Sequence, residues 1–208
     1  MKILITGGNG DIAKSIRSMF LCSYDEIWIE TPGKGELDVT DENIVRTYIT
    51  SVKPDVLINC AGYIETGLLA DISMTDFRKH FDVNVFGALL CSKEAVKNGC
   101  RTIINIGSTS SFESKPSWGA YCSSKAALVA ITEAFSKEGI SCYGLHPGRT
   151  ATKMRKRLFP DEDTSTLSSP SRIASFVFKI INNEFSNGSQ IIVFKNHYYI
   201  LGSRMCVR

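Results

Sequence analysis

KILITGGNGDIA, residues 2–13, is the stretch from which the fold is inferred. Its apolar start reads as a buried strand, and a glycine-rich turn leads from that strand into a helical segment at 11–22. Gly7 and Gly10 allow backbone conformations that other residues resist, and they let the chain approach a ligand closely. Because the helix that begins here aims its free amides and positive dipole end at the turn, the stretch predicts a site for the pyrophosphate of a dinucleotide. The expected contacts are Gly7, Asn9, Gly10, Asp11 and Ile12.

The rest of the chain repeats this alternation of strand and helix. Short runs rich in Val, Ile and Leu occur at 26–30, 55–59, 102–106, 141–145 and 190–194. Amphipathic segments between them predict helices at 41–52, 73–97, 118–138 and 170–183. Near-continuous apolar strands suit a sheet covered on both faces, and repeated strand–helix–strand units give parallel strands with right-handed crossovers. We therefore predict an α/β fold, a Rossmann-like, doubly wound parallel sheet in a three-layer α/β/α arrangement, formed by 1–208 as a single domain.

The composition excludes several classes of protein. The chain has 208 residues, of which 43% are hydrophobic and 22% charged, as in ordinary soluble globular proteins. A net charge of +3 is too small to indicate binding to nucleic acid or to an anionic membrane. No apolar run is long enough to span a bilayer, and the N-terminus lacks the features of a signal peptide. We therefore expect a cytoplasmic protein.

The cysteines and histidines give no sign of a metal site. The seven cysteines include no CxxC pair, and the three histidines do not cluster beside any of them. We expect no bound metal, and free thiols are the default for cysteines in a cytosolic protein.

Glu30 bears on the choice between NAD and NADP. It lies 20 residues after Gly10, at the end of the second predicted strand. An acidic side chain there can accept hydrogen bonds from the adenosine ribose and would repel a 2′-phosphate. This position favours NAD over NADP as the cofactor. The alternative is a solvated charge, with Lys34 in the next loop able to reach a phosphate instead.

Three further small motifs follow along the chain. DVTD at 38–41 comes first, and NCAG at 59–62 ends the third apolar run. A small, glycine-containing turn at the carboxyl end of a strand is where a flat ring or a ribose can lie against backbone. NVFG at 84–87 lies midway along a predicted helix, where asparagine is a poor helix former. Its side chain or a distorted backbone has some other use there, unless the asparagine is only tolerated.

Tyr121 and Lys125 lie four residues apart in WGAYCSSKAA, 118–127. Residues i and i+4 share a helix face, although a tyrosine and a lysine at this spacing are common by chance. Ser108 lies thirteen residues before Tyr121, at the strand edge where such sheets place their ligands. A strand end, a short loop and a helix start can bring the hydroxyl and the phenol together.

These motifs together resemble the short-chain dehydrogenase/reductase family. TGGNGDIA, NCAG, NVFG, NIGS, YCSSK and HPGRTAT occur in the family's order and near its spacing, and QIIVF resembles the family's last strand. The resemblance implies an NAD(P)-dependent oxidoreductase that interconverts an alcohol and a carbonyl by hydride transfer. It implies four catalytic residues, which are Asn84, Ser108, Tyr121 and Lys125. It implies further cofactor contacts, which are Asp38, Val39, Asn59, Ala61, Gly62, Pro147, Gly148, Thr150 and Thr152, together with Tyr121 and Lys125.

The chemistry of such a reaction suits these side chains. The proton donor must act near neutral pH, whereas a free tyrosine has a pKa of about 10. We expect the Lys125 ammonium, one helical turn away, to lower the pKa of Tyr121, helped by the positive charge of an oxidised nicotinamide. Ser108 would donate a hydrogen bond to the substrate oxygen. The family resemblance adds a water held by Asn84, through which Lys125 exchanges protons with solvent.

The chain also departs from the family's usual pattern, as an atypically short member. Its glycine motif is spaced as in the family's sugar-nucleotide branch, and ELDVTDENIVRTYITSVKPDVLINCAGY resembles the dTDP-4-dehydrorhamnose reductases. The later half resembles simple carbonyl reductases instead. Only residues 31–36 separate Glu30 from LDV at 37–39, which is too few for a crossover helix, so we expect that helix to be missing and a short third strand to follow. A sugar or sugar-nucleotide reductase or dehydrogenase and a non-catalytic NAD(P)-binding regulator stay open as alternatives.

The segment at 149–169 follows HPG, where the family usually selects its substrate. Its basic run at 153–157 reads as a solvated loop, or as a lid whose cations meet an anionic substrate or a cofactor phosphate. The partner expected at this site is a small carbonyl or alcohol. The resemblance also implies a homodimer or homotetramer, with the helices at 73–97 and 118–138 as contact surfaces.

Overall fold

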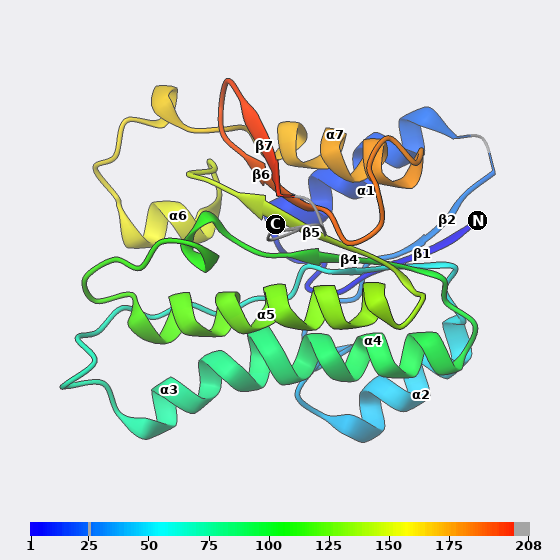
Figure 1. Ribbon diagram of the computed structural model, residues 1–208, viewed down its shortest axis with the longest axis horizontal. Coiled ribbons are helices and arrows are strands. Elements are labelled where there is room, and N and C mark those ends of the chain that lie inside the picture. The colour runs from blue at the N-terminus through cyan, green and yellow to red at the C-terminus, as the bar shows by residue number, and fades with distance from the viewer. Residues whose placement is uncertain (25, 202–208) are drawn as a thin grey trace, which may run out of the picture.

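The computed structural model describes residues 1–24 and 26–201. Its centre is a seven-stranded sheet with the strand order β2-β1-β3-β4-β5-β6-β7. The strands are β1 (Lys2–Ile5), β2 (Trp28–Glu30), β3 (Val56–Asn59), β4 (Thr102–Ile106), β5 (Ser141–Pro147), β6 (Gln190–Val193) and β7 (Tyr198–Leu201). The first six pair in parallel and lie close to the predicted positions. Figure 1 shows helices on both sides of the sheet, so the predicted doubly wound α/β fold is confirmed.

The helices form two layers. α1 (Asp11–Ser23) and α7 (Pro170–Ile181) pack together on one face, above the sheet in Figure 1. The other face is covered by α2 (Glu42–Val52), α4 (Ala88–Lys97) and α5 (Gly119–Lys137). Shorter elements are α3 (Met74–Phe81), the π-helix η1 (Asp82–Gly87), the 3₁₀ helices η2 (Thr109–Ser111) and η3 (Thr164–Thr166), and α6 (Lys153–Leu158). Among the described residues, no helix is both long enough and apolar enough to cross a bilayer.

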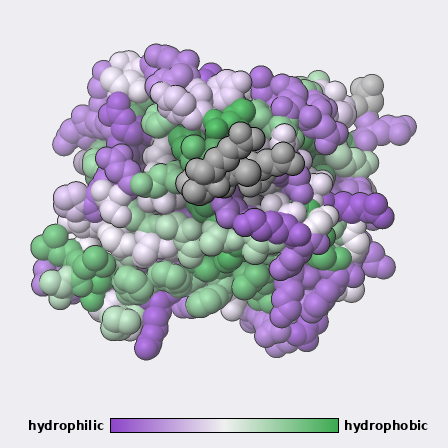
Figure 2. Space-filling view, viewed as in Figure 1, coloured by the Kyte–Doolittle hydropathy of each residue, from purple (hydrophilic) through white to green (hydrophobic). Residues whose placement is uncertain are grey.

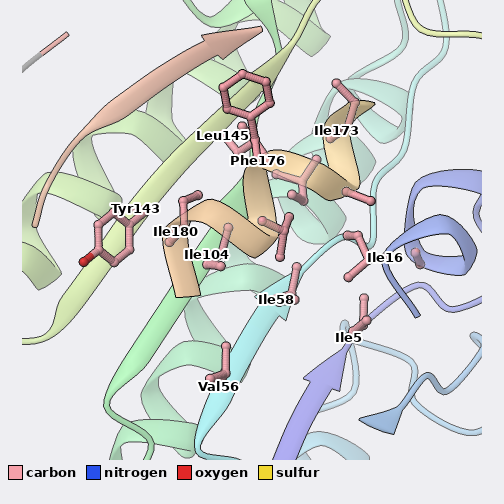
Figure 3. Packing of buried hydrophobic residues seen from close by; sticks show 14 of the residues in the cluster. Ile5, Ile16, Val56, Ile58, Ile104, Tyr143, Leu145, Ile173, Phe176 and Ile180 are labelled. Carbon is pink, nitrogen blue, oxygen red and sulfur yellow. The ribbon is translucent and has the colours of Figure 1, made fainter. Parts of the chain in front are cut away.

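Alternation along the strands divides the core in two. Ile3 and Ile5 of β1 belong to the cluster beneath α1 and α7, whereas Leu4 between them belongs to the cluster beneath α2 and α4. Figure 3 shows the first cluster, in which Ile16 of α1 and Phe176 of α7 lie over the strands. Fully burying an aliphatic or aromatic side chain stabilises a fold by about 1.5–3 kcal/mol. Cores on both faces therefore hold the strand ends in fixed positions.

The connection from β2 to α2 differs from the expectation in one respect. Residues 31–41 contain no helix, as predicted, but LDV at 37–39 adds no strand to the sheet. Leu37 and Val39 instead join the buried cluster beneath α2 and α4. The expected third strand was wrong because these two apolar side chains are buried against helices, which requires no strand pairing. Asp41 then caps α2, since its Oδ1 accepts hydrogen bonds from two amides of the first turn at 2.9 and 3.0 Å.

β7 was not predicted, and it corrects the expectation of an entirely parallel sheet. It pairs antiparallel with β6, with Val193 opposite Tyr198. A tight turn joins the two strands, closed by a hydrogen bond from the Phe194 amide to the His197 carbonyl at 2.9 Å. A two-strand hairpin needs no crossover, so its signal in the sequence was only the short polar stretch between two apolar runs.

The cysteines within the described residues are free thiols. Cys91, Cys100, Cys122 and Cys142 are buried and pack as small apolar side chains. Cys206 lies outside the described residues.

Candidate active site

A cavity of about 240 Å³ opens at the carboxyl edge of the sheet, beside the ends of β3, β4 and β5 and the turn after β1. α6 covers its outer side, at the left of Figure 1, close to the start of α5. The predicted site residues that line the cavity are Asn9, Gly10, Asp11, Ile12, Gly62, Ser108, Tyr121, Lys125, Pro147, Gly148, Thr150 and Thr152. Residues far apart in the sequence meet here because the ends of parallel strands lie at one edge.

The glycine turn forms one wall of the cavity. Gly7 has a φ of 69°, in the left-handed region that favours glycine, and a Cβ there would lie 2.7 Å from the Cα of Ala61. The Ala13 amide in the first turn of α1 faces the Cys60 thiol, whereas Gly10, the N-cap residue, has no side chain to bind the amides of Asp11 and Ile12. Those amides are therefore available to an anionic group. Thr6 Oγ1 fixes the turn after β3, because it accepts hydrogen bonds from the amides of Cys60 and Ala61, both at 3.1 Å.

Ser108, Tyr121 and Lys125 converge on the cavity from β4 and α5. Ser108 Oγ accepts a hydrogen bond from the Ser110 amide at 3.1 Å, and the serine also hydrogen-bonds the phenol of Tyr121. Tyr121 lies in the first turn of α5, and Lys125 follows one turn later on the same face. Lys125 Nζ donates to the Ile106 carbonyl at 2.9 Å and lies 6.0 Å from the centre of the Tyr121 ring. The hydroxyl and the phenol are thus neighbours, with an ammonium close behind them.

The pKa values of this group differ from the expectation. Burial raises the pKa of Tyr121 to about 12, and the hydrogen bond with Ser108 offsets this only in part. Burial also lowers the pKa of Lys125 to about 8. We expected Lys125 to lower the pKa of Tyr121, but in the protein alone the loss of water around the phenol has the larger effect. At neutral pH the phenol is therefore protonated, but it is a weaker acid than free tyrosine, and the expected lowering of its pKa is absent in the protein without a bound nucleotide.

Asn84 lies in η1, the π-helix that interrupts the long predicted helix between α3 and α4. Its Oδ1 accepts a hydrogen bond from the Tyr63 amide at 2.8 Å. Its Nδ2 donates to the Tyr63 carbonyl at 2.9 Å and to the Ser124 hydroxyl at 3.0 Å. A Cβ on Gly62 would lie 3.6 Å from Asn84 Oδ1 and 3.9 Å from Lys125 Nζ, so both groups border the same glycine. Asn84 therefore holds the backbone at Tyr63 beside the cavity.

Several predicted residues do not reach the surface of the cavity. Those that do not line it are Gly7, Glu30, Asp38, Val39, Asn59, Ala61 and Asn84. Asn59 points into the interior, where its Nδ2 donates to Asn105 Oδ1 at 2.8 Å and to Ser92 Oγ at 2.9 Å. This network ties β3 to β4 and α4, and the asparagine has a structural use as a result.

The two acidic residues near the expected adenosine position have partners within the protein. The Glu30 carboxylate accepts hydrogen bonds from the Trp28 indole at 2.9 Å and the Tyr48 phenol at 3.4 Å. Burial alone would raise the pKa of Asp38, but hydrogen bonds from Thr40 and the neighbouring Lys34 ammonium hold it below its usual value. Lys34 Nζ lies 3.4 Å from the Asp38 carboxylate, so the lysine considered for a phosphate contact is paired here.

The basic run at 153–157 forms α6, the central part of the 149–169 segment. Thr152 caps this helix by accepting a hydrogen bond from the Arg155 amide at 3.1 Å. The Lys153 amide donates to Asp11 Oδ2 at 2.6 Å, which joins α6 to the glycine turn. The covered outer side of the cavity is therefore built from a short, capped helix rather than an irregular loop.

The arginines of α6 are paired within the protein. Arg155 binds Glu162 through two hydrogen bonds of 2.6 Å, which hold the pKa of the Glu162 carboxyl below its usual value. Arg157 donates to the Ile64 carbonyl at 2.6 Å and also binds the Glu65 carboxylate. These contacts fasten α6 across the mouth of the cavity.

Sequence reasoning missed the apolar wall of the cavity. This wall consists of Tyr63, Ile64, Trp118, Met154 and Leu158. Two signals could have found part of it. Tyr63 and Ile64 directly follow the NCAG turn, and Trp118 lies one helical turn before Tyr121.

Comparison with known proteins defines the class. A family model described as short chain dehydrogenase matches residues 35–163, which is more than half of the chain. The chain belongs to the short chain dehydrogenase family, and the resemblance of its motifs to that family is confirmed.

Curated relatives match over part of their length. The chain is 34% identical over 130 residues to the uncharacterized oxidoreductase YusZ of Bacillus subtilis, covering 57% of this chain and 46% of the relative. It is 38% identical over 109 residues to an NADPH-dependent aldehyde reductase-like protein, chloroplastic, of Arabidopsis thaliana, covering 48% of this chain and 40% of the relative. The chain thus spans about half the length of the curated relatives it matches.

Solved structures match over nearly the whole fold. A structure of ElxO with NADP bound superposes with a TM-score of 0.79 at 26% identity, covering 90% of this chain and 94% of the other. The ligand-free aldohexose dehydrogenase of Thermoplasma acidophilum superposes with a TM-score of 0.81 at 22% identity, covering 92% of each chain. The second likeness concerns the fold alone.

Proposed function

We propose that this protein is an NAD(P)-dependent oxidoreductase that interconverts an alcohol and a carbonyl compound by hydride transfer. The observation that carries the proposal is the meeting of Ser108, Tyr121 and Lys125 in one cavity with the glycine turn. Membership in the short chain dehydrogenase family supports it, as does the likeness to ElxO, whose structure contains NADP.

The residues present fit a nicotinamide nucleotide. The uncapped amides at the start of α1 suit its pyrophosphate. Gly62 and Gly148 line the cavity and carry no side chain, so a flat ring can lie directly against the backbone there. Pro147, Thr150 and Thr152 border the same space. When bound, the nucleotide supplies a hydride to the carbonyl carbon, or accepts one from the alcohol carbon.

The chain's own residues handle the proton and the substrate oxygen. In the reducing direction, the Tyr121 phenol gives its proton to the carbonyl oxygen as the carbon receives the hydride, so a ketone becomes an alcohol. Ser108 donates a hydrogen bond to the same oxygen and fixes its position. Lys125 stabilises the tyrosinate that remains and returns to it a proton taken from solvent. Asn84 holds the backbone of Tyr63 by the hydrogen bonds of its side chain. Its amide lies near Gly62, the glycine that Lys125 also approaches.

Both nicotinamide nucleotides are candidates, and the Glu30 carboxylate at the end of β2 favours NAD. A 2′-phosphate placed near this carboxylate would be repelled. The hydrogen bonds from Trp28 and Tyr48 keep the carboxylate at the strand end. Titration of the protein with NADH and NADPH, followed by fluorescence, measures the preference.

The experiment that tests the function compares two tyrosine variants. Tyr121→Phe should retain nucleotide binding but lose turnover by about 100-fold or more, because it removes the proton donor. Tyr24→Phe is the matched control, since Tyr24 lies at the far end of α1 and its phenol binds Asn182. Turnover is followed by nucleotide absorbance over a panel of ketones, aldehydes and alcohols. Equal turnover in Tyr121→Phe and the wild type would refute the proton role.

A further inference from the structure

The wall of the cavity that lies away from the glycine turn is apolar. Tyr63 and Ile64 contribute to it from the chain after β3, Trp118 from the start of α5, and Met154 and Leu158 from α6. Figure 2 shows hydrophobic residues gathered at the lower left edge of the molecule, below the level at which Figure 1 draws α6 and beside the start of α5. The space beyond the reacting groups thus meets carbon atoms over most of its boundary.

Trp118 is held in place beside the reacting phenol. Its ring lies edge-on to the Tyr121 ring, with centres 5.8 Å apart at 81°. It also stacks on Phe159, with centres 5.9 Å apart at 25°. A substrate whose carbonyl oxygen is hydrogen-bonded to Tyr121 therefore has its remaining atoms next to the Trp118 ring.

Two of the charged groups beside this wall, Arg155 and Arg157, have partners within the protein. The Arg155 guanidinium binds Glu162 and lies 4.0 Å from the centre of the Phe159 ring. The Arg157 guanidinium binds the Ile64 carbonyl and Glu65. Lys153 also lines the cavity, but it is exposed to water, so its ammonium offsets little of the cost of moving an anionic substrate out of water. The hydroxyls of a sugar would meet Ile64, Met154 and Leu158, which offer no hydrogen-bonding oxygen or nitrogen.

We propose that the substrate is a compact carbonyl compound, or its alcohol, built on an apolar ring of the cyclohexanone or benzaldehyde kind. The inference rests on the proposed function, since Tyr121 and Ser108 fix the position of the reacting oxygen. A polar group that is buried without a partner costs roughly 1–3 kcal/mol, so each added hydroxyl on the ring weakens binding. The hydrogen bond from Arg157 to the Ile64 carbonyl holds α6, with Met154 and Leu158, beside the cavity, and this favours a compact molecule.

A matched set of ketones tests the proposal. Cyclohexanone, its pentahydroxy analogue and its carboxylate-bearing analogue share one ring and one carbonyl, and kcat/KM is measured for each with NADH and with NADPH. We expect cyclohexanone to exceed both analogues by about tenfold or more, the effect of one unpaired buried polar group. Preference for either analogue would overturn the inference and leave the proposed function intact. No turnover of any of these ketones or of cyclohexanol would contradict both.

A pair of methionine variants shows whether the wall sets this preference. Met154 lines the cavity and is 42% exposed, whereas Met74 lies outside it in α3 and is 60% exposed. Met154→Gln should reduce the ratio of kcat/KM for cyclohexanone over its pentahydroxy analogue several-fold, because it adds a hydrogen-bonding group to the wall. Met74→Gln should leave that ratio unchanged. Equal ratios in the two variants would mean that the apolar wall does not select the substrate.

Discussion

Replacing Gly8 by alanine should destabilise the protein, because the loop after β2 lies directly on this glycine. The Gly8 amide donates to the Pro32 carbonyl at 2.9 Å. A Cβ on Gly8 would lie 2.0 Å from the carbonyl oxygen of Thr31 and 2.5 Å from its carbonyl carbon. These are backbone atoms, so the whole loop would have to move. In this chain the loop takes the place of a crossover helix, and its contact with the glycine turn shapes the nucleotide side of the cavity.

The cost follows from this overlap. Forcing a methyl group into a closely packed site costs about 1–3 kcal/mol, which lowers the Tm of a protein of this size by roughly 2–12 °C. Gly35→Ala is the matched control, because a Cβ on Gly35 meets nothing within 4 Å. Its Tm should stay close to that of the wild type or rise slightly, since alanine restricts the unfolded chain.

Thermal and urea unfolding of both variants, followed by circular dichroism, measures the difference. We also expect weaker NADH or NADPH binding in Gly8→Ala, because the displaced loop distorts the glycine turn. Equal Tm values for Gly8→Ala and Gly35→Ala would show that the loop does not rest on the turn as described.

Two further predictions concern α6 and a buried histidine. Arg157→Ala should raise the KM for the ketone about fivefold, because it releases α6 from Ile64 and Glu65. Lys156→Ala should leave the KM unchanged. Equal KM values for the two variants would show that Arg157 does not hold α6 at the cavity. Burial lowers the pKa of His146 to about 4. Between about pH 6.5 and pH 4 this histidine is therefore protonated in the unfolded chain but neutral in the folded protein, so the free energy of unfolding falls as the pH drops through that range. Urea unfolding should show a shallower fall in His146→Gln but not in His197→Gln, and identical slopes in all three proteins would exclude this explanation.

The sequence was sufficient to predict the parts of the site that depend on local spacing. Gly7 and Gly10 lie where a strand passes into a helix, and Tyr121 and Lys125 lie one turn apart, so both arrangements follow from backbone geometry. The strand ends that bring Ser108 to Tyr121 follow from the parallel sheet.

Other features depend on packing that spacing alone does not reveal. LDV at 37–39 alternates like a strand, yet its apolar side chains are buried under helices. The pKa of Tyr121 depends on how completely the phenol is buried, and this cannot be predicted from the four-residue spacing to Lys125. Arg157 pairs with Glu65, which is far away in the sequence, so the partner of this arginine could not be predicted from the charges of α6.

Transfer of deuterium from the nucleotide to the substrate carbon tests whether this protein catalyses hydride transfer. Wild-type protein is mixed with cyclohexanone and with NADH or NADPH carrying deuterium at the transferable position of the nicotinamide ring, and the alcohol is examined by mass spectrometry. We expect a single deuterium on the carbon that bears the hydroxyl, and about 100-fold less labelled alcohol in the same time with Tyr121→Phe. Alcohol without deuterium, or equal labelling by the two proteins, would contradict this expectation.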